Sequence, residues 1–248
     1  MCKMKSGLIL KDRVFIPDYD SHSDMLEELG INDTEENAER LFVRAELSPS
    51  NGDVFSPVDT WAFNVDQDIV PEWFVKDVEK DRMVEAVKEW AKDHIHIGVD
   101  SLKINSGSNH YIKDCKDVEI YGSATVKDIC GSATVKDICG SATVEYIYGS
   151  ATVKNIYGSA TVKNICGSAT VKNIYGSATV KTICGSATVE YICGSATVIG
   201  SPYGWENKDK FILSNNATFK DHEAKVIYQS GDWELRLVNN VLSEDSKE

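Results

Sequence analysis

The chain has 248 residues, with 39 acidic against 26 basic side chains and a formal net charge of −13. Apolar residues make up 42% and aromatic residues 9%, a globular composition that excludes an intrinsically disordered chain. No apolar run approaches the roughly 18 residues of a membrane-spanning helix, and residues 1–15 lack the apolar core of a signal peptide. We therefore predict a cytoplasmic protein.

Residues 1–112 are predicted to form an N-terminal α+β domain. Ser21 and Asp24 make a capping-box pattern at the start of a short helix, and Asp33 is a candidate cap for a second helix. Apolar residues then recur at helical spacing up to His94. The patterns predict helices over residues 21–28, 34–40 and 80–94, and strands over residues 42–47, 61–65 and 95–104.

A short repeat determines the predicted fold class. The pentapeptide Gly-Ser-Ala-Thr-Val begins nine times between residues 122 and 194, at a strict period of nine. Because β-branched residues suit strands and Gly-Ser suits a corner, we predict a mainly β protein with a parallel β-solenoid of nine nonapeptide repeats over residues 113–200. Ala, Val and Ile at positions three, five and eight should point inward, and positions two, four and six outward.

The number of repeats in one coil stays open between two, which gives 18 residues, and three, which gives 27. We favour two, although Tyr121, Tyr148 and Tyr175 at position nine recur in every third copy and favour three. Position nine exchanges Cys for Tyr, which a close-packed interior would not accept cheaply. We therefore predict this position at a corner or on the outer surface.

Residues 201–248 are predicted to form a C-terminal β cap that covers the open sheet edge, followed by an acidic tail over 243–248. Short strands are expected at residues 211–213, 217–219, 224–228 and 233–238. Of seven cysteines, five occupy position nine of the repeat, and no CxxC framework for zinc is present. We predict reduced thiols that pack as small apolar groups.

Two patterns in the N-terminal region invite a metal hypothesis. Potential metal ligands alternate from Asp18 through Asp20 and His22 to Asp24, as in a calcium loop. An EF-hand would need Gly and Glu where Ser23 and Leu29 stand, and helix capping explains the pattern more simply. A second pattern, His94-x-His96, offers two ligands without an evident third.

An acidic cleft formed by Asp66, Asp68 and Glu72 is also conceivable, but capping of a turn explains these residues as well. No GxSxG, phosphate loop, HExxH or dinucleotide-binding motif is present. We predict no enzyme, no catalytic residues, no metal and no cofactor.

Three activities are conceivable for the repeat itself. A calcium-binding β-roll needs GGxGxD, which the copies lack. Nucleic-acid binding needs a strongly basic face, whereas residues 122–199 carry six basic and four acidic side chains. Rows of Ser and Thr resemble the hydroxyl arrays of ice-binding solenoids, which leaves ice binding as a remote alternative.

Several segments carry a resemblance: residues 61–73 (WAFNVDQDIVPEW), the helix that ends in VKEW at 87–90, YIKDC at 111–115, and the nonapeptides. In this order they resemble a family of phage and prophage proteins with a small N-terminal domain and tandem repeats of the Gly-Asn-Ser-x-Val type. The repeat of this chain departs by carrying Gly-Ser-Ala-Thr-Val. The resemblance implies a phage-type origin and an intracellular setting, and it assigns no functional residues.

The favoured function is a non-enzymatic phage-type interaction protein that binds a host protein, with interference in host defence as one possible purpose. Two alternatives are a self-assembling structural or virion-associated protein and a small ligand-binding or enzymatic N-terminal domain on a solenoid. Nucleic acid and membranes are not expected as partners, and a homo-oligomer is possible. The candidate interaction surface comprises Trp61, Asp66, Asp68, Trp73, Tyr146, Tyr148, Tyr157, Tyr175 and Tyr191.

Overall fold

The computed structural model describes residues 5–207, 211–221, 224–230 and 235–238. Its contacts divide the chain between Ile95 and His96 into two compact units, and each is considered by itself. The boundary predicted from the sequence was at residue 112. Strands within residues 96–112 pair with strands of the solenoid, so these residues are described with the second unit.

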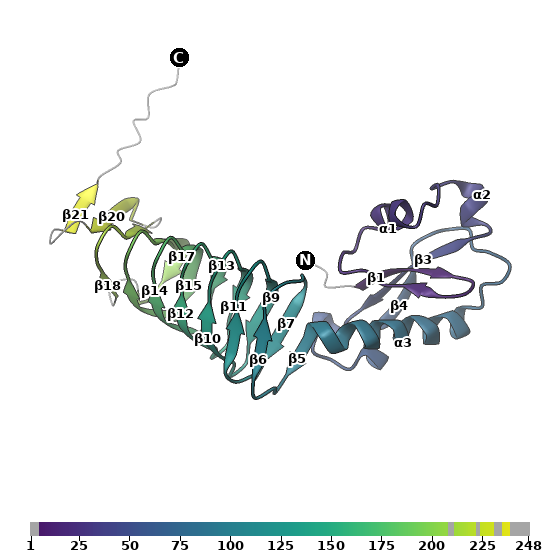
Figure 1. Ribbon diagram of the computed structural model, residues 1–248, viewed down its shortest axis with the longest axis horizontal. Helices are drawn as coiled ribbons and strands as arrows, with labels where there is room; N and C mark the ends of the chain where they lie inside the picture. Colours follow the sequence, from purple (N-terminus) through teal and green to yellow (C-terminus); the bar gives the residue numbers. More distant parts are fainter. Residues whose placement is uncertain (1–4, 208–210, 222–223, 231–234, 239–248) are drawn as a thin grey trace, which may run out of the picture. The chain divides into compact units, whose positions relative to one another are not determined.

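The first unit is a four-stranded sheet in the order β2-β1-β3-β4, whose neighbouring strands are antiparallel. Helices α1 and α2 lie on one face of this sheet and α3 on the other (Figure 1). The elements are β1 (Lys5–Leu10), β2 (Val14–Phe15), α1 (His22–Glu28), α2 (Glu35–Ala38), β3 (Phe42–Ser48), β4 (Ala62–Val65) and α3 (Lys76–His94), with 3-10 turns at Ser50–Gly52 and Val58–Thr60.

Two apolar layers hold this unit together. Leu8 and Phe42 of the sheet pack with Met25 and Leu26 of α1. On the opposite face, a Cβ at Gly7 would lie 3.0 Å from the terminal carbon of Met83 in α3, so the missing side chain lets this helix approach β1 closely. The α+β class predicted for this region is confirmed.

Some local predictions need correction. The cap of α2 is Thr34, whose hydroxyl accepts from the Asn37 amide, and not Asp33, whose carboxylate pairs with Arg44 instead. The long helix α3 begins at Lys76, one turn earlier than predicted. The strand predicted over 95–104 is two strands in different sheets, because Gly98 turns the chain at a φ of 65°.

The second unit is a solenoid of about seven coils built from two sheets (Figure 1). One sheet contains β6 (Leu102–Ile104), β8 (Val118–Ile120), β10 (Thr134–Ile138), β12 (Thr152–Ile156), β14 (Thr170–Ile174), β16 (Thr188–Ile192) and β18 (Ile212–Leu213). The other contains β5 (Ile95–Ile97), β7 (His110–Lys113), β9 (Thr125–Cys130), β11 (Thr143–Ile147), β13 (Thr161–Ile165), β15 (Thr179–Gly185), β17 (Thr197–Trp205), β19 (Thr218–Asp221), β20 (Val226–Ser230) and β21 (Leu235–Val238).

The strand register establishes the length of one coil. Thr134 pairs with Thr152 in one sheet, and Thr143 pairs with Thr161 in the other, always in parallel. Each coil therefore has 18 residues and two repeats, which confirms the favoured alternative and excludes 27. The inward positions are Ala, Val and Ile as predicted, and from Ala124 to Val198 none of them is more than 2% exposed.

The corners need glycine for two reasons. Gly140 and its equivalents have φ between 61° and 70°, a region that other residues enter only at a cost of about 1–2 kcal/mol. In addition, a Cβ on Gly140 would lie 2.9 Å from the backbone nitrogen of Gly122 in the coil below. Position nine immediately precedes this glycine, so its side chain lies at the corner, as predicted.

Short strands lie within one or two residues of the positions predicted for β18, β19 and β20, and β21 covers the described part of the fourth, whose first two residues lie outside the described residues. β17 and β19 continue the parallel stack, and β20 and β21 then add to its edge in antiparallel orientation. Aromatic rings replace the small repeat side chains in this region: Phe219 meets Trp205 and Phe211 edge-on at centroid distances of 5.5 and 4.8 Å. The acidic tail predicted over 243–248 lies outside the described residues.

We predict that deletion of residues 140–157 leaves a folded solenoid, because Cys139 would join Gly158 and β13 would take the place of β11 in the same sheet. Deletion of residues 140–148 should be far more harmful, because it moves every later strand to the opposite sheet. Thermal unfolding followed by circular dichroism is expected to stay cooperative for the first deletion only. Equal behaviour of the two variants would contradict the 18-residue coil.

Candidate functional site

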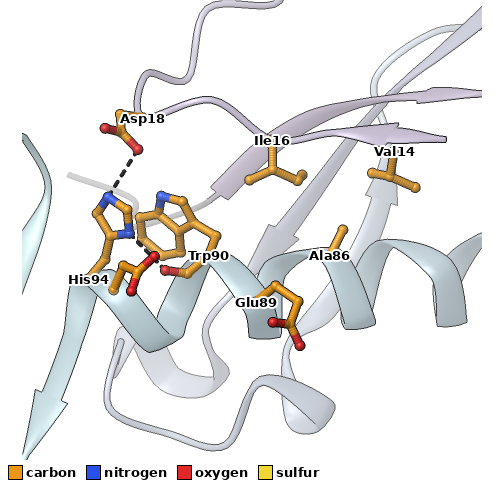
Figure 2. Close-up of a pocket in the computed structure, with 8 residues that line it drawn as sticks. Val14, Ile16, Asp18, Ala86, Glu89, Trp90 and His94 are labelled. Atoms are coloured by element: carbon orange, nitrogen blue, oxygen red, sulfur yellow. Dashed lines mark hydrogen bonds and ion pairs between the residues drawn. The ribbon is translucent and has the colours of Figure 1, made fainter.

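A shallow cleft of about 510 Å³ lies between the β2 region and helix α3 of the first unit (Figure 2). Figure 2 shows apolar side chains on one part of its rim and carboxylates and a stacked histidine on the other. The lining residues are Val14, Ile16, Asp18, Ala86, Glu89, Trp90, Asp93 and His94.

His94 is tied to its surroundings through both ring nitrogens. Its ring stacks on Trp90 at 4.4 Å, Nδ1 lies 2.7 Å from the Trp90 carbonyl oxygen, and Nε2 lies 3.0 Å from the Asp18 carboxylate. Both partners are acceptors, so only the protonated ring can donate to both. A general base needs an available lone pair on its ring. The geometry instead favours a structural role for His94, in which the ring connects α3 to the segment after β2.

A buried lysine lies on the same side of the sheet. Lys5 is 2% exposed, and its ammonium group donates to the Tyr19 carbonyl and forms an ion pair with Asp20 at 2.6 Å. It also lies 5.1 Å from the Trp90 ring centre, within the range of a cation–π contact. Burial lowers the pKa of Lys5, and Asp20 opposes that shift. The indole nitrogen of Trp90 is buried without a hydrogen-bond partner among the described residues.

Three potential metal ligands gather on the other face of the sheet. His22 begins α1, Glu46 lies in β3 and Asp66 follows β4, and one ligand atom from each lies within 4.8 Å of the other two. His22 Nδ1 is 3.3 Å from the Asp66 carboxylate, and Nε2 is 3.3 Å from the Ala45 carbonyl oxygen.

Glu46 is a carboxylate of this cluster whose pKa is shifted. Burial raises the pKa of Glu46 first, and the negative charge of Asp66 raises it further, while His22 opposes the shift. Sequence reasoning named His22 and Asp66 in separate hypotheses and missed Glu46. Its one signal was a polar residue at an outward position of an alternating strand.

The residues from Asp18 to Asp24, considered as a metal pattern and assigned instead to helix capping, contact separate partners. Asp18 pairs with His94 and Asp20 with Lys5, while the Asp24 amide donates to the Ser21 hydroxyl at the start of α1. The capping interpretation is thus confirmed. The second pattern is divided between the units, since His94 belongs to the first and His96 stacks on His110 in the second.

The predicted interaction residues of the first unit are unequally exposed. Trp61 is buried and its indole donates to the Ser56 carbonyl at 3.0 Å, whereas Trp73 is half-buried and donates to the Arg40 carbonyl at 2.9 Å. Asp66 and Asp68 are exposed. Neither Trp61 nor Trp73 lines the cleft beside Trp90.

The five predicted tyrosines lie on different faces of the second unit. Tyr146 is on the ten-stranded sheet and Tyr191 on the seven-stranded sheet, each 43% exposed. Tyr148 is at the corner after β11. Tyr157 and Tyr175 stack at the other corner, with ring centres 4.9 Å apart and planes within 1°. The structure brings only this last pair together.

The five cysteines at position nine follow the same corner ladders. Cys166 and Cys184 form a disulfide between successive coils, so the prediction of reduced thiols is wrong for these two residues. The reason is positional, because they are 18 residues apart and therefore stack. Cys115, Cys130, Cys139 and Cys193 are free thiols, and burial raises the pKa of Cys130 and Cys193, which favours their protonated form.

The outer faces carry polar ladders. On the ten-stranded sheet, Glu145 lies between Lys127 and Lys163 and contacts their ammonium groups at 2.9 and 3.0 Å. On the seven-stranded sheet, Asn155 donates to Asp137, and Asn173 donates to Asn155 at 3.0 Å. The rows of Thr considered for ice binding are thus flanked by charged and amide side chains.

Comparisons of this chain with protein-family models, with curated proteins and with solved structures found no match. The resemblance to phage and prophage proteins therefore stays a prediction. Within the part of the chain that the structure describes, none of the helices combines the length and apolar character needed to cross a membrane.

We predict that Glu145→Gln destabilises the solenoid by about 0.5–1 kcal/mol at neutral pH, a size typical of ion pairs near the surface. Burial would raise the pKa of Glu145, but Lys127 and Lys163 outweigh it, and the pKa falls below its ordinary 4.5. Because the folded-state pKa is lowered, the stabilisation is complete above about pH 4.5 and is lost as the pH falls through the lowered value.

Urea unfolding of the wild type and Glu145→Gln, at neutral pH and in acid, measures this difference. Glu190→Gln is the matched control, because Glu190 occupies the same repeat position without an ion pair among the described residues. A difference that persists unchanged in acid would rule out the proposed electrostatic origin.

Proposed function

We propose that the chain is a non-enzymatic interaction protein, in which the solenoid is a scaffold and the first unit carries the surface that recognises another protein. The scaffold role is supported by the filled interior of the stack, where the inward Ala, Val and Ile side chains are at most 2% exposed. The residues of the stack occupy the space that a ligand would need, and rigid repeat arrays commonly serve to present surfaces.

The segregation of charge supports recognition by the first unit and is the observation that carries the proposal. Residues 1–95 contain 22 acidic and 11 basic side chains, a net charge of −11. Residues 96–248 contain 17 acidic and 15 basic side chains, a net charge of −2. A field of this kind steers a basic partner toward one part of the molecule.

The acidic side chains of the first unit are most concentrated around α1 and α2. Residues 24–39, here called the acidic segment, contain seven exposed carboxylates and no lysine or arginine. Arg40 pairs with Glu36 and Arg44 with Asp33, and the other five carboxylates have no ion pair among the described residues. The carboxylates are those of Asp24, Glu27, Glu28, Asp33, Glu35, Glu36 and Glu39.

The partner that fits this surface is a protein with a basic face. A nucleic-acid-binding protein has such a face, because it must neutralise phosphates. The resemblance to phage and prophage proteins points to a protein of the bacterial host, and occupation of a host defence protein is one form that the interaction would take.

The test is affinity capture from host lysate with the full chain as bait, at low salt and again at several-fold higher salt. Glu27→Gln, Glu35→Gln and Glu39→Gln are combined in one variant, which removes three unpaired charges from the acidic segment. Asp12→Asn, Glu72→Gln and Asp81→Asn are combined in a matched control with the same charge change elsewhere in the unit. These three control carboxylates are also exposed.

We expect a basic protein, identified by mass spectrometry, to be captured by the wild type and the control, and its capture to fall with salt. The acidic-segment variant should retain at least ~10-fold less of it, as expected when charges at the contact are removed. Equal capture by both variants would refute the role of the acidic segment. Recovery of the bait alone would contradict an interaction function, and light scattering over a concentration series would then test self-assembly.

A further inference from the structure

The cluster of His22, Glu46 and Asp66 has the spacing of ligands around one metal ion. With metal–ligand distances of about 2.1 Å, two ligand atoms of a tetrahedral site lie about 3.4 Å apart. The distance between His22 Nδ1 and the Asp66 carboxylate is 3.3 Å, and the Glu46 carboxylate lies within 4.8 Å of both.

His22 has the orientation of a metal ligand whose second ring nitrogen is fixed by a backbone carbonyl. Its Nε2 lies 3.3 Å from the Ala45 carbonyl oxygen, which can only accept, so the proton of a neutral ring belongs on Nε2. The lone pair on Nδ1 then faces the Asp66 carboxylate. Two such groups repel unless a proton or a cation lies between them. Ligating histidines commonly donate their other ring nitrogen to a backbone carbonyl in this way.

A further polar group at the same place lacks a partner. Ser6 stands directly opposite Glu46 in the pairing of β1 with β3, so the two side chains project from the same face of the sheet. Ser6 is 1% exposed, and its hydroxyl has no hydrogen-bond partner among the described residues. A buried hydroxyl opposite the Glu46 position is suited to bind a metal-coordinated water or the outer oxygen of a ligating carboxylate.

We propose that His22, Glu46 and Asp66 bind one divalent first-row transition-metal ion, with water in the remaining coordination positions. One imidazole and two carboxylates suit Mn²⁺, Fe²⁺ and Zn²⁺. The ion would join the start of α1 to β3 and to the segment after β4. It would also fix the acidic segment, which begins two residues after His22, against the sheet.

Mn²⁺ is the probe for the test, because the thiols elsewhere in the chain would take up Zn²⁺. The full chain is titrated with Mn²⁺ at neutral pH, and free Mn²⁺ is measured by electron paramagnetic resonance. We expect one bound ion for each chain and a metal-dependent rise in the thermal unfolding temperature, since the ion binds the folded state. Glu46→Gln and Asp66→Asn should each weaken binding by at least ~10-fold and abolish the rise.

Asp68→Asn is the matched control, because it removes the same charge from an exposed residue two positions from Asp66, and it should bind as the wild type does. Glu46→Gln also removes the repulsion between carboxylates, so the metal-free variant should fold. If it does not, Asp66→Asn decides the question, because the Asp66 side chain is 61% exposed and its change leaves the core intact.

Two results would overturn the proposal: less than one ion held by the wild type at millimolar Mn²⁺, or equal affinity in the wild type, Glu46→Gln and Asp66→Asn. The proposed interaction function does not depend on this site, so either result would leave it untouched. Loss of partner capture would likewise say nothing against metal binding.

Discussion

The solenoid depends on one constraint, which is that each residue stacks on the residue 18 positions away. Parallel pairing of identical strands keeps Thr on Thr and Val on Val through the stack. Every coil must therefore turn at the same two places and approach the coil below at the same distance. At Gly140 the backbone of Gly122 leaves no room for a side chain, so the demand for glycine comes from the stacking as well as from the turn.

In-register stacking also places like beside like on the outer surface, where identical charges would repel. On the ten-stranded sheet, Glu145 at position six separates Lys127 from Lys163 and relieves the repulsion there. Ahead of the repeats, Glu119 accepts from Lys103 and Lys136, which together lower its pKa. The inward positions show no comparable variation, because apolar side chains gain from identical neighbours. The copies thus differ at outward and corner positions, whereas the inward Ala, Val and Ile are kept.

The fold of the second unit was predictable because the stacking of equivalent residues requires a sequence repeat, and the nine-residue period is visible in the sequence. The inward positions and the corner glycines followed from it, and the coil length was open only between two values. The flanking strands lie outside the period, and the strand predicted over 95–104 proved to be two. The disulfide between Cys166 and Cys184 could not be predicted from either residue alone. It became evident once the 18-residue coil placed the two residues in contact. The caps of short helices were less predictable, since Asp33 and Thr34 are both residue types that cap helices, and Asp33 pairs with Arg44 while Thr34 makes the cap.

The first unit allows no such inference, because its polar sites are assembled from distant segments. Asp18, Asp20 and His22 are near neighbours in the sequence, yet each is bound to a different part of the unit: α3, β1 and the end of β4. Glu46, by contrast, is 24 residues from His22 and shares a cluster with it. A local pattern of ligand types therefore included one residue of this cluster, His22, together with residues that lie elsewhere. Only the pairing of β1, β3 and β4 reveals the set.

The alternation of repeats between two sheets gives the stack two independent lines of side chains. Position nine of one set of copies forms one edge, which contains Tyr157 and Tyr175, and position nine of the other set forms the opposite edge, which contains Cys166 and Cys184. A substitution in any copy consequently alters one edge and leaves the other as it was. In a chain built from one nine-residue unit, substitutions in alternate copies can therefore produce an aromatic edge and a disulfide-linked edge independently of each other.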